Sequence, residues 1–269
     1  MIKEILNQIS EKLPENNRFE RIWKIAQVDF KKRYYNDRLG LFWAFLNPVM
    51  QVLVYWAVFT FLMKRVSEDI PNFGLFLFSA LICWMFFKEV SKKSMKVLKQ
   101  KKYLIENIKV DKIDLFLSNG ISSLIGFYFN IFAYGVVALL LFNTSFSLNL
   151  LYLPILICNL FLMGMGFGMI LSTIYIYARD IDHLLDIFFL LVMWTSGVFF
   201  PAERVIEFWR PMFYINPFLG IFKNIRAVLV YDSTINIQIM SLNFSVGLLV
   251  FILGIHVVNK YTHKALEYL

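Results

Sequence analysis

Few residues in this chain combine the types and spacing that chemistry requires. Asp180, Asp182 and Asp186 are the one group of carboxylates close together at the edge of an apolar run, and Arg179 stands beside them. Clustered carboxylates can perform acid–base catalysis, so the group would suit a membrane-embedded transferase acting on a lipid-linked sugar. The neighbouring arginine favours a structural ion pair instead, and we expect no catalytic residues.

Histidines and glycines give no sign of a metal or nucleotide site. His183, His256 and His263 are far apart and lack the spacing of metal ligands. None of the twelve glycines is followed by lysine, so the chain has no P-loop for ATP. Glycines 164, 166 and 168 lie in an apolar run, where small residues let helices approach closely. We expect no metal and no cofactor on this chain.

The elements that position these residues are apolar helices. The 269 residues are 59% hydrophobic and only 17% charged, whereas soluble domains carry about 25% charged residues. A helix of about 20 apolar residues crosses a bilayer core. Six charge-poor runs are near or above that length: about 41–63, 73–88, 115–142, 150–177, 184–200 and 240–258. The sequence therefore predicts an all-α polytopic membrane protein, with a cytoplasmic N-terminus over 1–40 and a six-span domain over 41–269.

The lysines and arginines predict the orientation. Assigning successive loops to alternate sides places twenty-one of them with the two termini and six on the opposite side. Because basic loops stay in the cytoplasm, both termini are expected inside, in the inner or plasma membrane. The net charge of +8 follows from this bias and from contact with anionic head groups.

Two segments on the predicted cytoplasmic side are amphipathic. In 18–38, apolar residues recur at helical spacing between basic ones, which is typical of a helix lying in the membrane interface. It could be an anchor only, or it could also contact a cytoplasmic partner. The 88–114 segment is either a solvated basic loop or a coupling loop of short helices that docks a soluble protein. Its apolar residues favour docking, above all Leu98, Leu104, Ile105 and Ile108.

The predicted outer side carries one long segment, 201–239. Pro201, Pro211 and Pro217 break it into pieces, and its apolar part contains Lys223 and Arg226. A seventh crossing is therefore not expected. We predict re-entrant gate helices between the fifth and sixth spans, which requires cover by protein or a cavity at membrane depth.

The crossing runs contain almost no ionisable residues, so no proton relay is expected and energy for transport must come from elsewhere. Aromatic residues are abundant and could contact lipid or line a conduit, since ring faces suit the C–H faces of sugars. The candidates for a conduit are Trp43, Tyr55, Trp56, Phe59, Tyr128, Phe132 and Trp194.

Three stretches resemble one family. Arg33-Tyr34, Leu39-Gly40, Trp43 and Pro48 resemble the pattern before and into the first span of permease subunits of ABC type-2 exporters, especially those for O-antigen and other cell-surface polysaccharides. Arg179-Asp180-Ile181 followed by 196–201, and Asn216-Pro217 followed by Arg226, resemble two later patterns of that family. Asp37 and Gly197 depart from it, where Ser and Pro are frequent, which leaves the subfamily open.

The resemblance implies a homodimeric permease that exports a polyprenyl-diphosphate-linked polysaccharide, as in lipopolysaccharide biosynthesis. Two copies of a separate P-loop ATPase would bind ATP and Mg²⁺. Arg179 and Asp180 would add to the coupling surface, and the external gate would include Glu203, Arg204, Pro217 and Arg226. Basic residues at the inner interface could attract the diphosphate or anchor lipid: Lys32, Arg33 and Arg38.

Several alternatives stay open. The same fold could export teichoic acid, capsule or a hydrophobic drug. The membrane-embedded transferase is a second alternative, and a passive channel is a third, although a channel would not need amphipathic docking segments.

Overall fold

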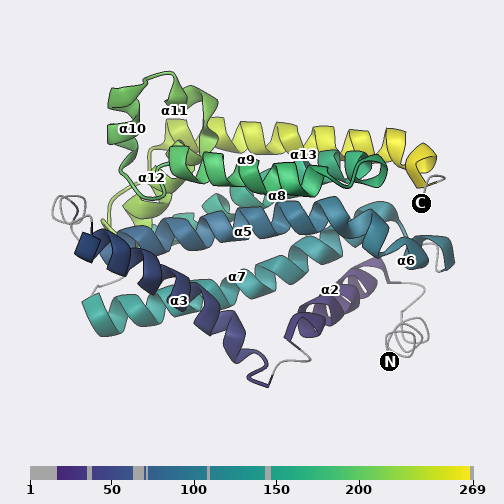
Figure 1. Cartoon of the computed structure of the whole chain (residues 1–269), viewed down its shortest axis with the longest axis horizontal. Helices are drawn as coiled ribbons and strands as arrows, with labels where there is room; N and C mark the ends of the chain where they lie inside the picture. The colour runs from purple at the N-terminus through teal and green to yellow at the C-terminus, as the bar shows by residue number, and fades with distance from the viewer. Residues whose placement is uncertain are drawn as a thin grey trace.

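The computed structural model describes residues 17–34, 38–62, 70, 72–107, 110–142 and 147–266, and the regular structure among them is helical. The long helices lie roughly side by side in a flat bundle (Figure 1). They are α3 (Phe42–Ala57), α5 (Phe73–Gln100), α7 (Lys112–Phe142), α8 (Leu153–Tyr177), α9 (Ile181–Thr195) and α13 (Ile237–Leu266).

Five helical stretches are long and apolar enough to cross a membrane: Phe42–Phe61, Phe73–Gln100, Lys112–Leu140, Leu148–Tyr177 and Ile237–Thr262. They coincide with five of the six predicted runs. The remaining run corresponds to α9, whose 15 residues extend about 22 Å as a helix, less than the about 30 Å of a bilayer core. The all-helical polytopic class is thus confirmed, whereas α9 by itself is too short to count as a sixth crossing.

The second span differs from its prediction. Helix α5 does not end near residue 88 but continues to Gln100, so the first half of the predicted 88–114 loop is the end of a long helix. Only α6 (Lys102–Asn107) stands as a separate short helix before α7 begins. The lysines between 88 and 99 fit this extension, because lysine has good helix propensity and its long side chain reaches past an apolar face.

Helix α5 is the centre of the bundle. It packs against α7 and α8, and α8 packs in turn against α13. Glycines on two faces of α8 allow α13 and α5 to pack closely against it. A Cβ added at Gly166 would lie 2.5 Å from the backbone of α13 at Val250 and Phe251, and one at Gly168 would lie 2.6 Å from the Ser91 carbonyl of α5. The predicted packing role of these glycines is thereby confirmed.

Helix α2 (Arg18–Tyr34) lies along α7 at one edge (Figure 1). Of the apolar residues in the amphipathic pattern, Ile22, Ala26 and Phe30 are buried within the subunit, whereas Phe19 and Trp23 are exposed. Ion pairs fasten the start of α2, because Arg18 and Arg21 pair with the fully buried Asp114 of α7 at 2.7 and 3.1 Å.

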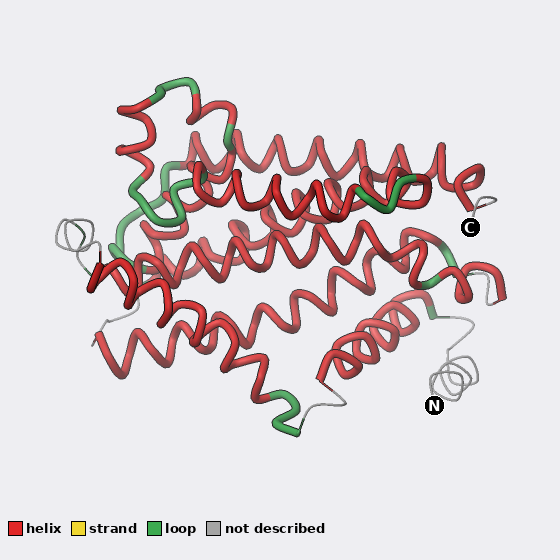
Figure 2. The backbone as a smooth tube through the Cα atoms, in the orientation of Figure 1, coloured by secondary structure: helices red, strands yellow, loops and turns green. Residues whose placement is uncertain are grey.

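The two ends of the bundle differ. One end carries α6, the start of α2 and the end of α13; we refer to it as the α6 end (Figure 1). The opposite end carries three short helices, α10 (Ala202–Phe208), α11 (Met212–Ile215) and α12 (Pro217–Leu229), and most of the described loops (Figure 2). We expected two short helices within 201–239; the structure has three before α13 begins at Ile237.

Candidate functional site

A groove lies between α3, α5, α7 and α9. Two cavities, of about 530 and 750 Å³, share Met85, Glu89 and Asn130 in their walls and therefore adjoin one another. Together they extend from Arg33 on α2 to Met193 on α9. Each cavity falls within the roughly 300–1,000 Å³ typical of ligand sites and together they exceed it, so the groove has room for more than one sugar ring.

Aromatic side chains line only part of this groove. Two of the predicted conduit aromatics, Trp43 and Tyr55 of α3, lie in its wall, and Trp84 of α5 joins them. Trp84 was not among the predicted conduit residues because it lies in an unbroken charge-free run, where the sequence gives no facing direction. Indole and phenol faces can stack on the C–H faces of sugars while still allowing them to slide.

The remaining predicted aromatics lie elsewhere. Phe59 is 2% exposed and stacks on Phe199 with ring centroids 5.3 Å apart, so it belongs to the core of the subunit rather than to an open path. Trp194 packs on the same Phe199 ring at 4.5 Å. Trp56, Tyr128 and Phe132 are exposed in the single chain.

Charged groups gather at the end of the groove nearest α6. Arg33 donates two hydrogen bonds to the carboxylate of Glu89, at 2.6 and 3.1 Å, and thereby links α2 to α5. This fork-to-fork geometry is strong and directional. Arg33 is therefore already engaged by a carboxylate, while the other two predicted diphosphate residues, Lys32 and Arg38, are exposed.

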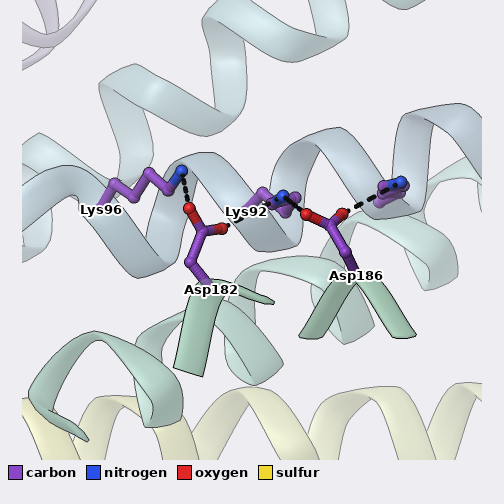
Figure 3. Close-up of polar contacts among 5 residues, drawn as sticks. Lys92, Lys96, Asp182 and Asp186 are labelled. Atoms are coloured by element: carbon purple, nitrogen blue, oxygen red, sulfur yellow. Dashed lines mark hydrogen bonds and ion pairs between the residues drawn. The ribbon is translucent and has the colours of Figure 1, made fainter. Parts of the chain in front are cut away.

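A ladder of ion pairs, which we call the α5–α9 ladder, joins α5 to α9 beside this charged end. Lys92 contacts Asp182 at 3.1 Å and Asp186 at 2.7 Å, while Lys96 contacts Asp182 at 2.5 Å (Figure 3). Lys88 extends the ladder to Asp186 at 3.3 Å. The spacing of four residues on each helix places all five side chains on facing surfaces. Asp182 and Asp186 thus pair with α5, which corrects the expected pairing with Arg179.

Helix α9 has little other attachment to the bundle. Of its residues only Leu185 and Phe189 are buried, and Phe189 meets the rings of Trp84 and Phe87 on α5. These two residues share the helix face of Asp182 and Asp186, since they recur at three- and four-residue steps. Phe188, on a neighbouring face, stacks on Phe167 of α8 with ring centroids 5.8 Å apart, so ion pairs and rings join α9 to α5 and a further ring contact joins it to α8.

The predicted coupling residues divide into two groups. Leu98 is fully buried and Leu104 is 6% exposed, while Ile105 is partly buried against the same core, so packing within the subunit accounts for their apolar character. Ile108 lies outside the described residues. Arg179 and Asp180 are exposed in the turn that precedes α9.

The exposed surface of α6 consists of other residues. Tyr103 is 44% exposed and Glu106 is also exposed. Sequence reasoning missed them because helical periodicity identifies an apolar face without saying whether it meets the core or a partner.

At the opposite end, two of the family-like stretches meet around Arg226. Its guanidinium donates to the carbonyl oxygens of Gly197 and Val198, both at 2.7 Å, and to that of Phe76 at 3.3 Å. The side-chain amide of Asn216 donates to the Ser196 hydroxyl at 3.0 Å. Gly197 has a φ of +71°, a left-handed conformation that glycine adopts without strain.

Arg226 is therefore a buried anchor rather than an exposed gate residue, being 3% exposed. The other predicted gate residues lie nearer the surface. Pro217 opens α12, and Glu203 and Arg204 are exposed on α10. Glu203 pairs with Lys223 at 2.7 Å. Partial burial raises the pKa of Glu203, but the hydrogen bond from Lys223, a backbone hydrogen bond and the charges of Lys223 and Arg226 together outweigh it and hold that pKa below its ordinary value.

Comparison with known proteins identifies the family. The sequence profile described as ABC-2 type transporter matches residues 20–230. The chain is 22% identical to the O-antigen export system permease protein RfbA of Klebsiella pneumoniae over 252 residues, which cover 93% of this chain and 95% of that protein. It is 23% identical to RfbA of Myxococcus xanthus over 206 residues, covering 76% and 78% of the two chains.

A relative with a different printed cargo is the polysialic acid transport protein KpsM of Escherichia coli, which is 22% identical over 196 residues covering 70% of this chain and 74% of that protein. The matched profile spans most of the helical bundle, including the groove, the α5–α9 ladder and the Arg226 anchor. This chain belongs to the ABC-2 type transporter family.

Proposed function

We propose that the chain is the membrane subunit of an ATP-driven exporter that moves a polyprenyl-diphosphate-linked polysaccharide of O-antigen type across the inner membrane. The observation that carries this proposal is the groove, with rings along its walls and charged groups at one end. That order suits a cargo with a sugar chain attached to a diphosphate. Two relatives named as O-antigen export permeases support it.

The proposed topology places the α6 end in the cytoplasm, in accord with the excess of lysine and arginine on that side. Helix α9, with the turn that follows it, is the sixth crossing, and α10–α12 form the outer gate. Both termini are then cytoplasmic. Two copies of the chain form a homodimer, with the exposed aromatics of α3 and α7 facing lipid or the second copy.

Two copies of a separate P-loop ATPase complete the proposed exporter. They bind ATP and Mg²⁺, since this chain has no P-loop. They dock at the α6 end, on Tyr103 and Glu106 of α6 and on the exposed turn of Arg179 and Asp180. Helix α2 transmits their movement to α5 through the hydrogen bonds between Arg33 and Glu89.

A capsular polysaccharide is the second candidate cargo, because one relative is named for polysialic acid transport. The two cargoes differ in their sugars, and the groove suits sugar rings in either case.

The test is purification of the tagged chain from its native membrane in mild detergent. We expect a P-loop ATPase to co-purify in stoichiometric amount, and a carbohydrate-binding domain on that ATPase would favour an O-antigen-type glycan. Intact chain that repeatedly purifies without any ATPase would overturn the proposal.

A further inference from the structure

Two residues, Lys88 and Lys92, belong both to the α5–α9 ladder and to the groove. Each lies in the wall of the larger cavity, next to Glu89 and Trp84. Their ammonium groups contact the two carboxylate oxygens of Asp186 at 3.3 and 2.7 Å. The side chains of Lys88 and Asp186 are 41% and 48% exposed, so a ligand in the groove can reach both partners of the pair.

The ladder has an excess of positive charge. Three lysines on α5 face two aspartates on α9, and the single carboxylate of Asp186 pairs with both Lys88 and Lys92. A group with two or more negative charges and several acceptor oxygens could bind both lysines at once. Lysine binds phosphate as a point charge, through hydrogen bonds about twice as strong as neutral ones.

We propose that Lys88 and Lys92 form a binding site for the diphosphate of a lipid-borne substrate, and that this diphosphate displaces Asp186 from the two ammonium groups. The inference rests on the proposed export function and names the residues that recognise the lipid end of the cargo. In the proposed topology these lysines lie at the inner end of the crossing part of α5, at the depth of lipid head groups.

Displacement of Asp186 changes how α9 is held. The contacts that persist are those of Asp182 with Lys92 and Lys96, in the first turn of α9, and the two buried apolar side chains. The ring contacts of Phe188 with Phe167 and of Trp194 with Phe199 also persist. Because Lys96 lies outside the walls of both cavities, the diphosphate leaves its contact intact. Helix α9 then pivots about its first turn and widens the groove at Leu190 and Met193, which form its α9 wall.

Binding to the full-length chain in phosphatidylcholine nanodiscs tests the site, with undecaprenyl diphosphate as the probe. Lys92→Gln should weaken binding about tenfold, the effect of one hydrogen bond to a charged group. Asp186→Asn should strengthen it about fivefold, because an exposed ion pair that competes is worth up to about 1 kcal/mol. Lys99→Gln is the matched control, on the same helix but outside the ladder and the groove, and should change binding less than about twofold.

Movement of α9 provides a second measurement. Spin labels at Leu191 of α9 and Leu249 of α13, both exposed, report the distance between these helices in a Cys158→Ser background. We expect undecaprenyl diphosphate to shift this distance in the wild type. Asp186→Asn should show part of the shift without ligand, since its ladder is already weakened. Inorganic pyrophosphate and phosphatidylglycerol are separate arms that distinguish the lipid diphosphate from a free anion and from a general anionic lipid.

Each outcome decides the inference. Weaker binding in Lys92→Gln with tighter binding in Asp186→Asn supports it. Wild-type affinity in Lys88→Gln and Lys92→Gln refutes the site. The ladder then only holds α9 to α5, and the proposed export function stands with the diphosphate bound elsewhere. Equal competition by phosphatidylglycerol refutes diphosphate recognition. A wild-type chain that purifies with an ATPase yet does not bind the probe refutes the site and leaves an exporter of another cargo.

Discussion

Replacing Arg226 by methionine tests its role as the buried anchor of the end that carries α10–α12. Methionine keeps an unbranched apolar stem but removes the donors to Gly197, Val198 and Phe76. The carbonyl of Phe76 still accepts a hydrogen bond from the Ser79 hydroxyl at 3.0 Å. The substitution therefore leaves two carbonyls, those of Gly197 and Val198, without the donors that they have at 2.7 Å.

The expected loss follows from these two groups. A buried polar group left without its partner costs about 1–3 kcal/mol, so two cost about 2–6 kcal/mol. Removing the buried cation also removes its desolvation penalty, which offsets part of that loss. We expect the free energy of unfolding to fall by about 3 kcal/mol, equivalent to a melting temperature about 5 °C lower in a chain of this size.

Thermal unfolding of the full-length chain in one detergent, followed by tryptophan fluorescence, measures the effect. Lys223→Met is the matched control: it removes a cation from the same helix, but from an exposed pair with Glu203 that contributes less than about 1 kcal/mol. Arg226→Lys should fall between the two, because one ammonium group cannot reproduce the forked geometry. An Arg226→Met chain that melts within about 2 °C of the wild type would refute the anchoring role.

Three further predictions concern the helices, the coupling surface and the gate. Gly166→Ala should lower the stability of the bundle by about 1–3 kcal/mol through overpacking against α13, whereas Gly135→Ala, with open space around its Cβ, should be neutral or slightly stabilising; equal melting temperatures would contradict the close approach. Tyr103→Ala should reduce the amount of co-purifying ATPase without changing the melting temperature, and an unchanged amount would exclude Tyr103 from the docking surface. Because the folded pKa of Glu203 is lowered, its pair with Lys223 contributes stability above the ordinary glutamate value and loses it as the pH falls through the folded pKa. Hydrogen exchange of α10–α12 in the wild type and Glu203→Gln should therefore differ at pH 6 and converge at acidic pH; a constant difference would contradict the assignment.

The sequence was informative where one physical constraint dominates. A bilayer core excludes charge, so charge-poor runs identify spans, and five of the six runs correspond to helices long enough to cross. Their ends were less predictable. Helix α5 continues through Lys88, Lys92 and Lys96. The sequence did not reveal this, because the ends of a span carry no signal that distinguishes a basic loop from a basic helix.

Contacts between distant residues account for most of what the sequence did not reveal. The spacing of Asp182 and Asp186 matched that of the three lysines, but nothing local indicates that α9 would pack with that face against α5. Leu98 and Leu104 show the same ambiguity, since an apolar face can meet the core or a partner. The burial of Arg226 was also unforeseen, because a cation in a broken apolar segment is usually expected at the surface.

The most direct test of the central claim is reconstitution of the chain with its co-purified ATPase in proteoliposomes that contain a fluorescent polyprenyl-diphosphate glycan. The measurement is the appearance of the glycan on the leaflet opposite the ATPase. We predict movement that requires ATP hydrolysis, stops with a non-hydrolysable analogue and is slowed by Lys92→Gln. Movement at the same rate without ATP, or ATP hydrolysis without glycan movement, would contradict the account.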